Sequence, residues 1–181
     1  MTQGRLLFTP IAGEPPSGER LIQALRRIGF VGAPLAGDGF LPGERFMQLL
    51  SFMGCSPFLR LEPTDDGSPF CQIRLTGPLP QPQAFPDAGG RPPRCPDCRA
   101  PLGDWQERLT GATVRCTACG TDLALASLAW GHHAGAGRLF LEVWEVYPGD
   151  GRPSEGLLAA LKEAGGAPWH WFWQGGGINR L

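Results

Sequence analysis

Four of the six cysteines occur as two Cys-x-x-Cys pairs, which constrain this chain more than any other feature. Cys95 and Cys98 form the first pair, Cys116 and Cys119 form the second, and seventeen residues separate them. Two residues between cysteines let one tight turn aim both sulfurs at one point, and zinc takes four such sulfurs at about 2.3 Å. A spacer of about 15–20 residues between the pairs is typical of zinc sites. The sequence therefore predicts one zinc ion per chain.

The residues between the pairs predict a β-hairpin, with strands at 105–109 and 112–115 and a turn at Thr110-Gly111. Segment 94–123 resembles the zinc-ribbon and rubredoxin-like group of four-cysteine knuckles. It departs from the common form at Arg99, where such knuckles usually carry glycine. The resemblance covers this segment alone, and it implies a metal-folded hairpin without naming an activity.

Three chemistries fit the four cysteines. A zinc site closed by four thiolates has no open coordination position, so it is structural rather than catalytic. Iron held by the same ligands would imply electron transfer. A dithiol redox site is the third alternative, but neither pair follows a strand and opens a helix, as thioredoxin-like motifs do. Structural zinc is the preferred interpretation, and zinc versus iron stays open.

Composition limits the other functions that this chain can have. The chain has 181 residues, 42% of them hydrophobic, which is enough for one ordinary domain with a small insertion. A net charge of −1 gives no general attraction to membranes or nucleic acid. The longest apolar stretch, 123–130, is under half of a membrane span, and 1–16 lacks the pattern of a signal peptide. We expect a soluble, cytoplasmic protein with reduced cysteines and no membrane partner.

Sequence periodicity predicts an α+β fold with a mixed or mostly antiparallel sheet, helices on one face, and an inserted zinc-ribbon hairpin. We expect 32–43 to be a loop and 64–68 to be a hairpin turn. The expected helices begin after Ser17, at Phe46 and after Ser154, and the first two end at Gly29 and Gly54. The expected strands are 5–9, 57–62, 70–76, 139–147 and 169–173.

Five segments follow from these expectations. Residues 1–76 and 124–174 form the two parts of the α+β domain. Residues 77–93 hold six prolines and form a semi-rigid linker to the ribbon at 94–123. Residues 175–181 form a flexible tail.

Outside the ribbon, His132 and His133 are the most informative polar residues, within the glycine-rich run 131–138. They could hold a second metal together with Cys55 and Cys71, or one of them could act as a general base. Neighbouring residues of an extended chain point in opposite directions, which disfavours binding of one ion by both. The glycine run leads into a strand, so it is not a phosphate loop, which must open a helix.

Three tryptophans of the last strand, Trp169, Trp171 and Trp173, share one face of it. Such a stripe could be a platform for bases, sugars or a proline-rich peptide. Packing against helices in the core is the preferred interpretation.

The leading functional hypothesis is a non-enzymatic zinc-ribbon protein whose structural zinc supports binding of another macromolecule. A protein partner is favoured over nucleic acid, because 91–122 contains five arginines against four acidic residues. One alternative is an enzyme with a site at the His132–His133 loop, aided by Glu142 and Cys71. Another is nucleic-acid binding through the arginines of the ribbon and exposed tryptophans.

Overall fold

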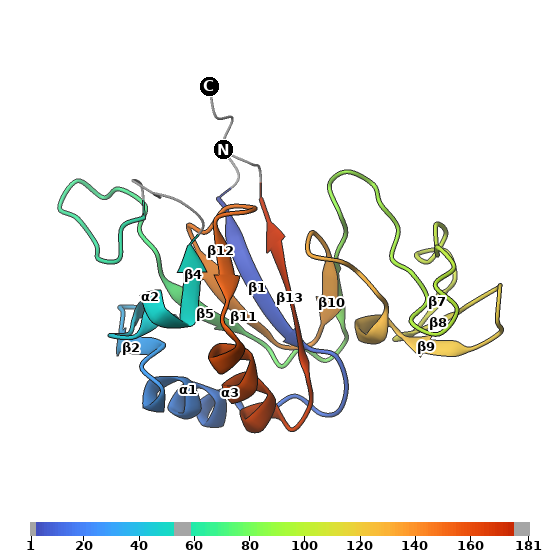
Figure 1. Ribbon diagram of the computed structural model, residues 1–181, viewed down its shortest axis with the longest axis horizontal. Helices are drawn as coiled ribbons and strands as arrows, with labels where there is room; N and C mark the ends of the chain where they lie inside the picture. The colour runs from blue at the N-terminus through green and yellow to red at the C-terminus, as the bar shows by residue number, and fades with distance from the viewer. Residues whose placement is uncertain (1–2, 53–58, 176–181) are drawn as a thin grey trace.

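The fold is built on one six-stranded antiparallel sheet (Figure 1). The computed structural model describes residues 3–52 and 59–175. The strands of this sheet, in spatial order, are β13 (Trp169–Gln174), β1 (Arg5–Pro10), β11 (Phe140–Trp144), β5 (Ile73–Thr76), β3 (Gly39–Pro42) and β2 (Val31–Pro34). Every strand pairing in the described ranges is antiparallel, and the predicted α+β class is confirmed.

Strand β1 lies between β13 and β11 and is buried on both faces. Leu6 and Phe8 point into the core beneath the helices, whereas Leu7 packs on the opposite face with Phe140 and Phe172. All three consecutive β1 residues are fully buried, which is why the sequence here is a continuous apolar run rather than an alternating one.

Two helices cover one face of the sheet, side by side, as Figure 1 shows: α1 (Gly18–Arg27) and α3 (Glu155–Gly165). Each begins at a serine cap, because Ser17 accepts a hydrogen bond from the N–H of Arg20 and Ser154 accepts one from the N–H of Leu157. Their apolar stripes complete the core beneath the sheet. Both helices were predicted, and both are confirmed.

The opposite face is partly covered by a two-stranded sheet of β6 (Gln83–Phe85) and β10 (Gly135–Gly137). The Phe85 ring meets Phe140 edge-on at 5.1 Å between centroids. A Cβ at Gly137 would collide with the hydroxyl of Thr9, so only glycine lets β10 approach β1 this closely. The proline-rich segment 77–93 thus contributes β6 to this second sheet.

The loop expected at 32–43 is instead a hairpin, formed by β2 and β3. The helix expected from Phe46 to Gly54 is also wrong: α2 (Phe46–Leu49) is short, and β4 (Leu50–Phe52) follows it. Leu50 takes an extended conformation because β4 pairs with β12 (Gly151–Pro153). Cross-strand hydrogen bonds therefore override the helical periodicity here, while Met53 and Gly54 lie outside the described residues.

The hairpin expected between 57–62 and 70–76 is wrong in its first strand. Residues 59–62 are irregular, while β5 starts at Ile73 and pairs with β11 and β3 instead. Pro57 and Phe58 lie outside the described residues. The turn itself forms: the N–H of Ser68 donates to Asp66, whose pKa is lowered first of all by the Thr64 hydroxyl. Asp66 is therefore a turn residue, as its sequence context indicates.

The ribbon is a three-stranded sheet in the order β7 (Leu109–Thr110), β8 (Thr113–Arg115) and β9 (Asp122–Ala124). Of the strand expected at 105–109, only Leu109 is extended, as the first residue of β7. Residues 103–108 form turns instead, and these turns bury Trp105. A short 3-10 helix, η1 (Leu125–Ser127), follows β9. The ribbon has a small core of its own, in which Trp105 and Trp130 meet edge-on at 5.1 Å.

The whole ribbon region is inserted between two neighbouring strands. Strands β5 and β11 pair directly, although residues 77–139 separate them in the chain. The two ends of this insertion are tied together, because the N–H of Leu79 donates to the carbonyl of Arg138 at 2.6 Å. In Figure 1, β7–β9 accordingly lie to one side of the main sheet, beyond β10.

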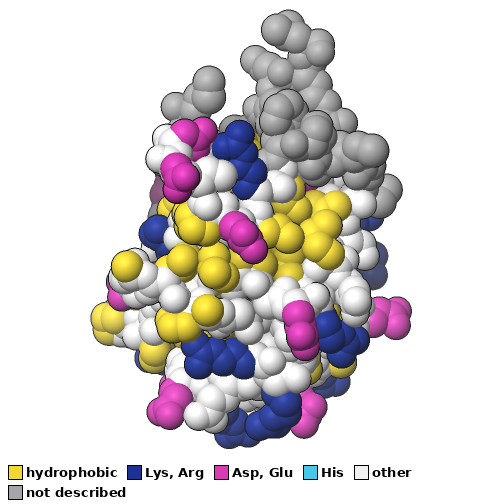
Figure 2. Space-filling view, turned by 90° about the vertical axis from the view of Figure 1, so that its left-hand side faces the viewer, with side chains coloured by type: hydrophobic (Ala, Val, Ile, Leu, Met, Phe, Trp, Pro, Cys, Tyr) yellow, Lys and Arg dark blue, Asp and Glu magenta, His cyan; other side chains and the backbone are white. Residues whose placement is uncertain are grey.

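The face of the body that lies away from the ribbon carries a band of hydrophobic side chains with charged ones around it (Figure 2). Met47 of α2 is half exposed, at 50%. Within 3–52 and 59–175, no helix combines the length and apolar character needed to cross a membrane. The predicted tail, apart from Gly175, lies outside the described residues.

We expect Ser154→Ala to lower the free energy of unfolding by about 1 kcal/mol, because the first turn of α3 loses its cap. Urea denaturation followed by circular dichroism measures this change. Ser51→Ala is the matched control, since Ser51 is exposed on β4, and its effect should stay within about 0.5 kcal/mol. Equal effects of the two substitutions would contradict the capping role of Ser154.

Candidate metal centre

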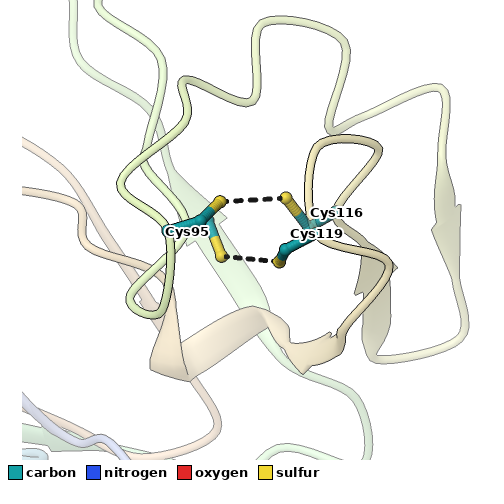
Figure 3. A group of neighbouring side chains, drawn as sticks. Cys95, Cys116 and Cys119 are labelled. Atoms are coloured by element: carbon teal, nitrogen blue, oxygen red, sulfur yellow. Dashed lines mark hydrogen bonds between the residues drawn. The ribbon is translucent and has the colours of Figure 1, made fainter.

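The sulfurs of Cys95, Cys98, Cys116 and Cys119 converge, all lying within 4.8 Å of one another (Figure 3). The first cysteine of each pair is buried and the second is exposed. The first pair lies in the segment that enters the ribbon, and the second lies in the turn between β8 and β9. The site therefore joins the two ends of the ribbon, and the prediction that these four residues form one cluster is confirmed.

Both cysteine pairs are held by the same backbone turn. The N–H of Arg99 donates to the carbonyl of Cys95 at 2.9 Å, and the N–H of Gly120 donates to that of Cys116 at 2.8 Å. Arg99 and Gly120 both have a positive φ, 63° and 79°. Arg99, the departure from the usual knuckle sequence, thus takes the conformation of the glycine it replaces. A side chain in this conformation costs about 1–2 kcal/mol.

The distances between sulfurs fit a tetrahedral metal site. Across the two knuckles, Cys95 and Cys119 are 3.8 Å apart, and Cys98 and Cys116 are 3.6 Å apart (dashed lines in Figure 3). Four sulfurs placed 2.3 Å from one ion at tetrahedral angles are separated by about 3.8 Å. A disulfide would need about 2.05 Å. The arrangement therefore suits one four-coordinate ion rather than two disulfides.

The electrostatics of the cluster also suit a cation. Hydrogen bonds from the hydroxyl and the N–H of Thr121 lower the pKa of Cys119 to about 6. At Cys98, the N–H of Ala100 lowers the pKa, but burial and the neighbouring thiols outweigh it and raise the pKa to about 12. Four thiols this close cannot all ionise without a positive ion between them. Thr121 is a supporting residue that the cysteine spacing did not reveal.

The arginines of the ribbon are largely engaged locally. Arg108 pairs with Asp104, and Arg115 lies 3.4 Å from Asp122. Arg94 donates to the carbonyl of Arg99 at 3.1 Å. Acidic partners thus neutralise Arg108 and Arg115, two of the four arginines in 94–123, which reduces the positive surface that a phosphate backbone would need.

His132 and His133 lie together in an exposed loop along the open edge of β13. The Nδ1 atom of His132 lies 3.0 Å from the carbonyl of Trp171, and its ring stacks on that indole at 3.9 Å. A hollow of about 420 Å³ opens beside both imidazoles, where Arg94 also lies. Sequence reasoning did not find this hollow, because its walls come from segments that only the fold brings together.

The other residues of the histidine hypothesis lie elsewhere. Glu142 is on β11, two strands from β13, where Arg5 and Thr76 hold its carboxylate at 3.2 and 2.7 Å. Cys71 is in the core beneath the helices, where burial raises the pKa of its thiol to about 12 and makes it unreactive. Cys55 lies outside the described residues. The structure thus brings neither Glu142 nor Cys71 to the histidine loop.

The tryptophan stripe packs inward. Trp169 and Trp173 are buried in the core beneath α1 and α3, and the half-buried Trp171 packs against the same core and against His132. The indole N–H of Trp173 donates to the carbonyl of Gly151 at 3.1 Å. The stripe is therefore a part of the core rather than an open platform for stacking.

No protein-family model matches this chain, and no curated protein or solved structure matches it either. Its functional interpretation therefore depends on the geometry of its own residues.

We expect Arg99→Gly to raise the stability of the metal-loaded ribbon by about 0.5–1 kcal/mol, because glycine takes a positive φ without steric cost. Thermal denaturation of the metal-loaded protein, followed by tryptophan fluorescence, measures this change. Gly120→Ala is the matched control at the other knuckle and should lower stability by about 1 kcal/mol or more. A loss of stability in Arg99→Gly would show that the arginine side chain itself supports the site.

Proposed function

We propose that this protein binds one structural zinc ion through Cys95, Cys98, Cys116 and Cys119, and that the zinc-folded ribbon binds another protein. The observation that carries the proposal is the convergence of the four sulfurs at tetrahedral spacing. Four thiolates leave no coordination position for a substrate, so the ion stabilises the fold and does not catalyse a reaction. Iron is the alternative ion for the same four ligands.

Metal binding supports the fold of the ribbon, which has few other sources of stability. Its strands contain only two or three residues each, and its core is a small cluster around two tryptophans. Structural zinc contributes about 10–16 kcal/mol in zinc-finger peptides at neutral pH. A contribution of that size would add substantially to the stability that this core supplies.

A protein partner is favoured by the surface of the ribbon. Leu109, on the edge strand β7, is an exposed large hydrophobic residue, with 36% of its surface accessible. The neighbouring charges are paired, Arg108 with Asp104 and Arg115 with Asp122. An apolar residue on an open strand edge, among neutralised charges, suits a protein surface better than a phosphate backbone.

The metal proposal predicts one zinc ion per chain. Native mass spectrometry of freshly purified protein, with elemental analysis, should show this stoichiometry. Cys98→Ser should lose the ion, because a hydroxyl is a poor substitute for a thiolate ligand. Cys71→Ala is the control and should keep it, since Cys71 lies in the other core. Bound iron would replace zinc in the proposal, and a metal-free protein with disulfides would overturn it.

The partner proposal predicts that proteins co-purifying with the wild type from its native cells are lost from two variants, Cys98→Ser and Leu109→Ser. Met47→Ser is the matched control, because Met47 is also an exposed hydrophobic residue but lies on α2 of the body. Loss of the partner in Met47→Ser alone would move the interface from the ribbon to α2 of the body. Retention by the metal-free Cys98→Ser protein would also contradict the proposal.

Nucleic-acid binding is the competing outcome. Binding of labelled oligonucleotides that weakens steeply as salt rises would favour it over a protein partner.

A further inference from the structure

A hollow of about 420 Å³ lies where the entry to the ribbon meets the histidine loop. Ligand pockets commonly measure about 300–1,000 Å³, so this hollow can hold a small molecule. The residues that line it include the basic or titratable side chains of Arg91, Arg94, His132 and His133, together with Asp87 and the aromatic ring of Trp130.

The histidine side of the hollow is fixed by β13. The carbonyl of His132 accepts from the N–H of Trp173 at 2.9 Å, and the carbonyl of His133 accepts from the side-chain amide of Gln174 at 3.1 Å. The contact between the Nδ1 of His132 and the carbonyl of Trp171 requires a proton on Nδ1, because a carbonyl only accepts. The Nε2 of His132 then donates to an anion only when the ring, which stacking holds in place, carries its second proton.

Two arginines, Arg91 and Arg94, also line the hollow. Arg91 lies 2.8 Å from Asp87, whose carboxylate also accepts from the N–H of Gly89. The hydrogen bond from the Gly89 N–H lowers the pKa of Asp87 most, and Arg91 lowers it further. Asp87 therefore stays ionised and bound to these two groups. Arg94 has no carboxylate within ion-pair distance in the described part of the chain, and its guanidinium donates to the carbonyl of Arg99.

The apolar wall is rigid. Trp130 is 8% exposed, its indole N–H donates to the carbonyl of Leu125 at 3.0 Å, and its ring packs edge-on against Trp105. The hollow thus presents N–H donors from two separate segments beside a fixed aromatic surface. Because this surface is already ordered, ligand binding costs less conformational entropy.

We propose that this hollow binds a small molecule that carries a phosphate group. Arg94 is the main contact, because its guanidinium has five N–H donors and no acid to neutralise it. His132 and His133 line the same hollow, and as imidazolium groups they add N–H donors to those of Arg94. A terminal phosphate offers three oxygens to such an arrangement, whereas a carboxylate offers two. This binding site is additional to the proposed protein-binding role of the ribbon and does not depend on it.

Isothermal titration calorimetry of the zinc-loaded protein with inorganic phosphate and with pyrophosphate tests the site. We expect saturable binding with a dissociation constant at or below about 1 mM for at least one of the two anions. Arg94→Gln should weaken it about tenfold or more, the usual effect of losing a charge-assisted hydrogen bond. Arg115→Gln is the matched control, since Arg115 is an exposed ribbon arginine paired with Asp122, and it should bind within about twofold of the wild type.

Sulfate provides an independent test of the histidines. Its charge stays constant between about pH 5.5 and pH 8, whereas histidine side chains lose their proton over that interval. Sulfate binding should therefore weaken as pH rises, and His132→Gln,His133→Gln should remove most of this dependence. The other charged or titratable groups facing these rings are Asp87, Arg91 and Arg94, together with His170, whose pKa is lowered by burial.

Zinc content and circular dichroism of each variant establish that it is folded. The double histidine variant keeps the ribbon arginines, so it tests the site even where Arg94→Gln disturbs the knuckle. The proposal is overturned if neither phosphate nor pyrophosphate binds saturably, or if Arg94→Gln and Arg115→Gln weaken binding equally. Tighter binding of an oligonucleotide than of pyrophosphate would assign the hollow to nucleic acid instead.

Discussion

Four thiolate sulfurs within 4.8 Å of one another repel strongly unless a cation lies among them. This constraint governs the ribbon, because the four sulfurs come from two separate segments, one before β7 and one between β8 and β9. The same constraint explains the paired turns, in which Arg99 accepts the strained conformation that Gly120 takes freely. A bound structural zinc ion would offset that strain, since it contributes about 10–16 kcal/mol in zinc-finger peptides, whereas one unfavourable φ costs about 1–2 kcal/mol.

The ribbon depends in turn on the main sheet. Strands β5 and β11 are neighbours, so residues 77–139 must leave the sheet and return to it at nearly the same point. The hydrogen bond between Leu79 and Arg138 joins the two ends of the insertion there. The paired strands β6 and β10 then pack the insertion on one face of the sheet. The histidine loop then covers the open edge of β13, which would otherwise present unpaired backbone groups. The basic hollow forms at this junction, from residues of the insertion that the edge of β13 holds in place.

Sequence patterns located α1 and α3 correctly because each signal there is local. Ser17 and Ser154 cap the first turns, and apolar residues at helical spacing face the sheet. The same reasoning failed at α2. The apolar residues there have helical spacing beyond Leu49, but the helix ends at Leu49 and β4 follows it. Nothing near Leu50 in the sequence identifies its partner, because β12 lies about a hundred residues later. The hairpin of β2 and β3 was not predicted, because its many glycine and proline residues are more typical of loops than of strands.

The sequence by itself determined the cluster of four cysteines, because a Cys-x-x-Cys turn fixes two sulfurs through local geometry and the spacer allows the second turn to meet the first. It also determined the α+β class and the capped helices. Only the tertiary structure decided the fates of the remaining candidates, since each depends on contacts distant in the chain. It buried Trp169 and Trp173 in the core, and it committed Glu142 to Arg5 and Thr76. It also brought Arg94 to the same hollow as His132 and His133, a proximity that no local pattern encodes.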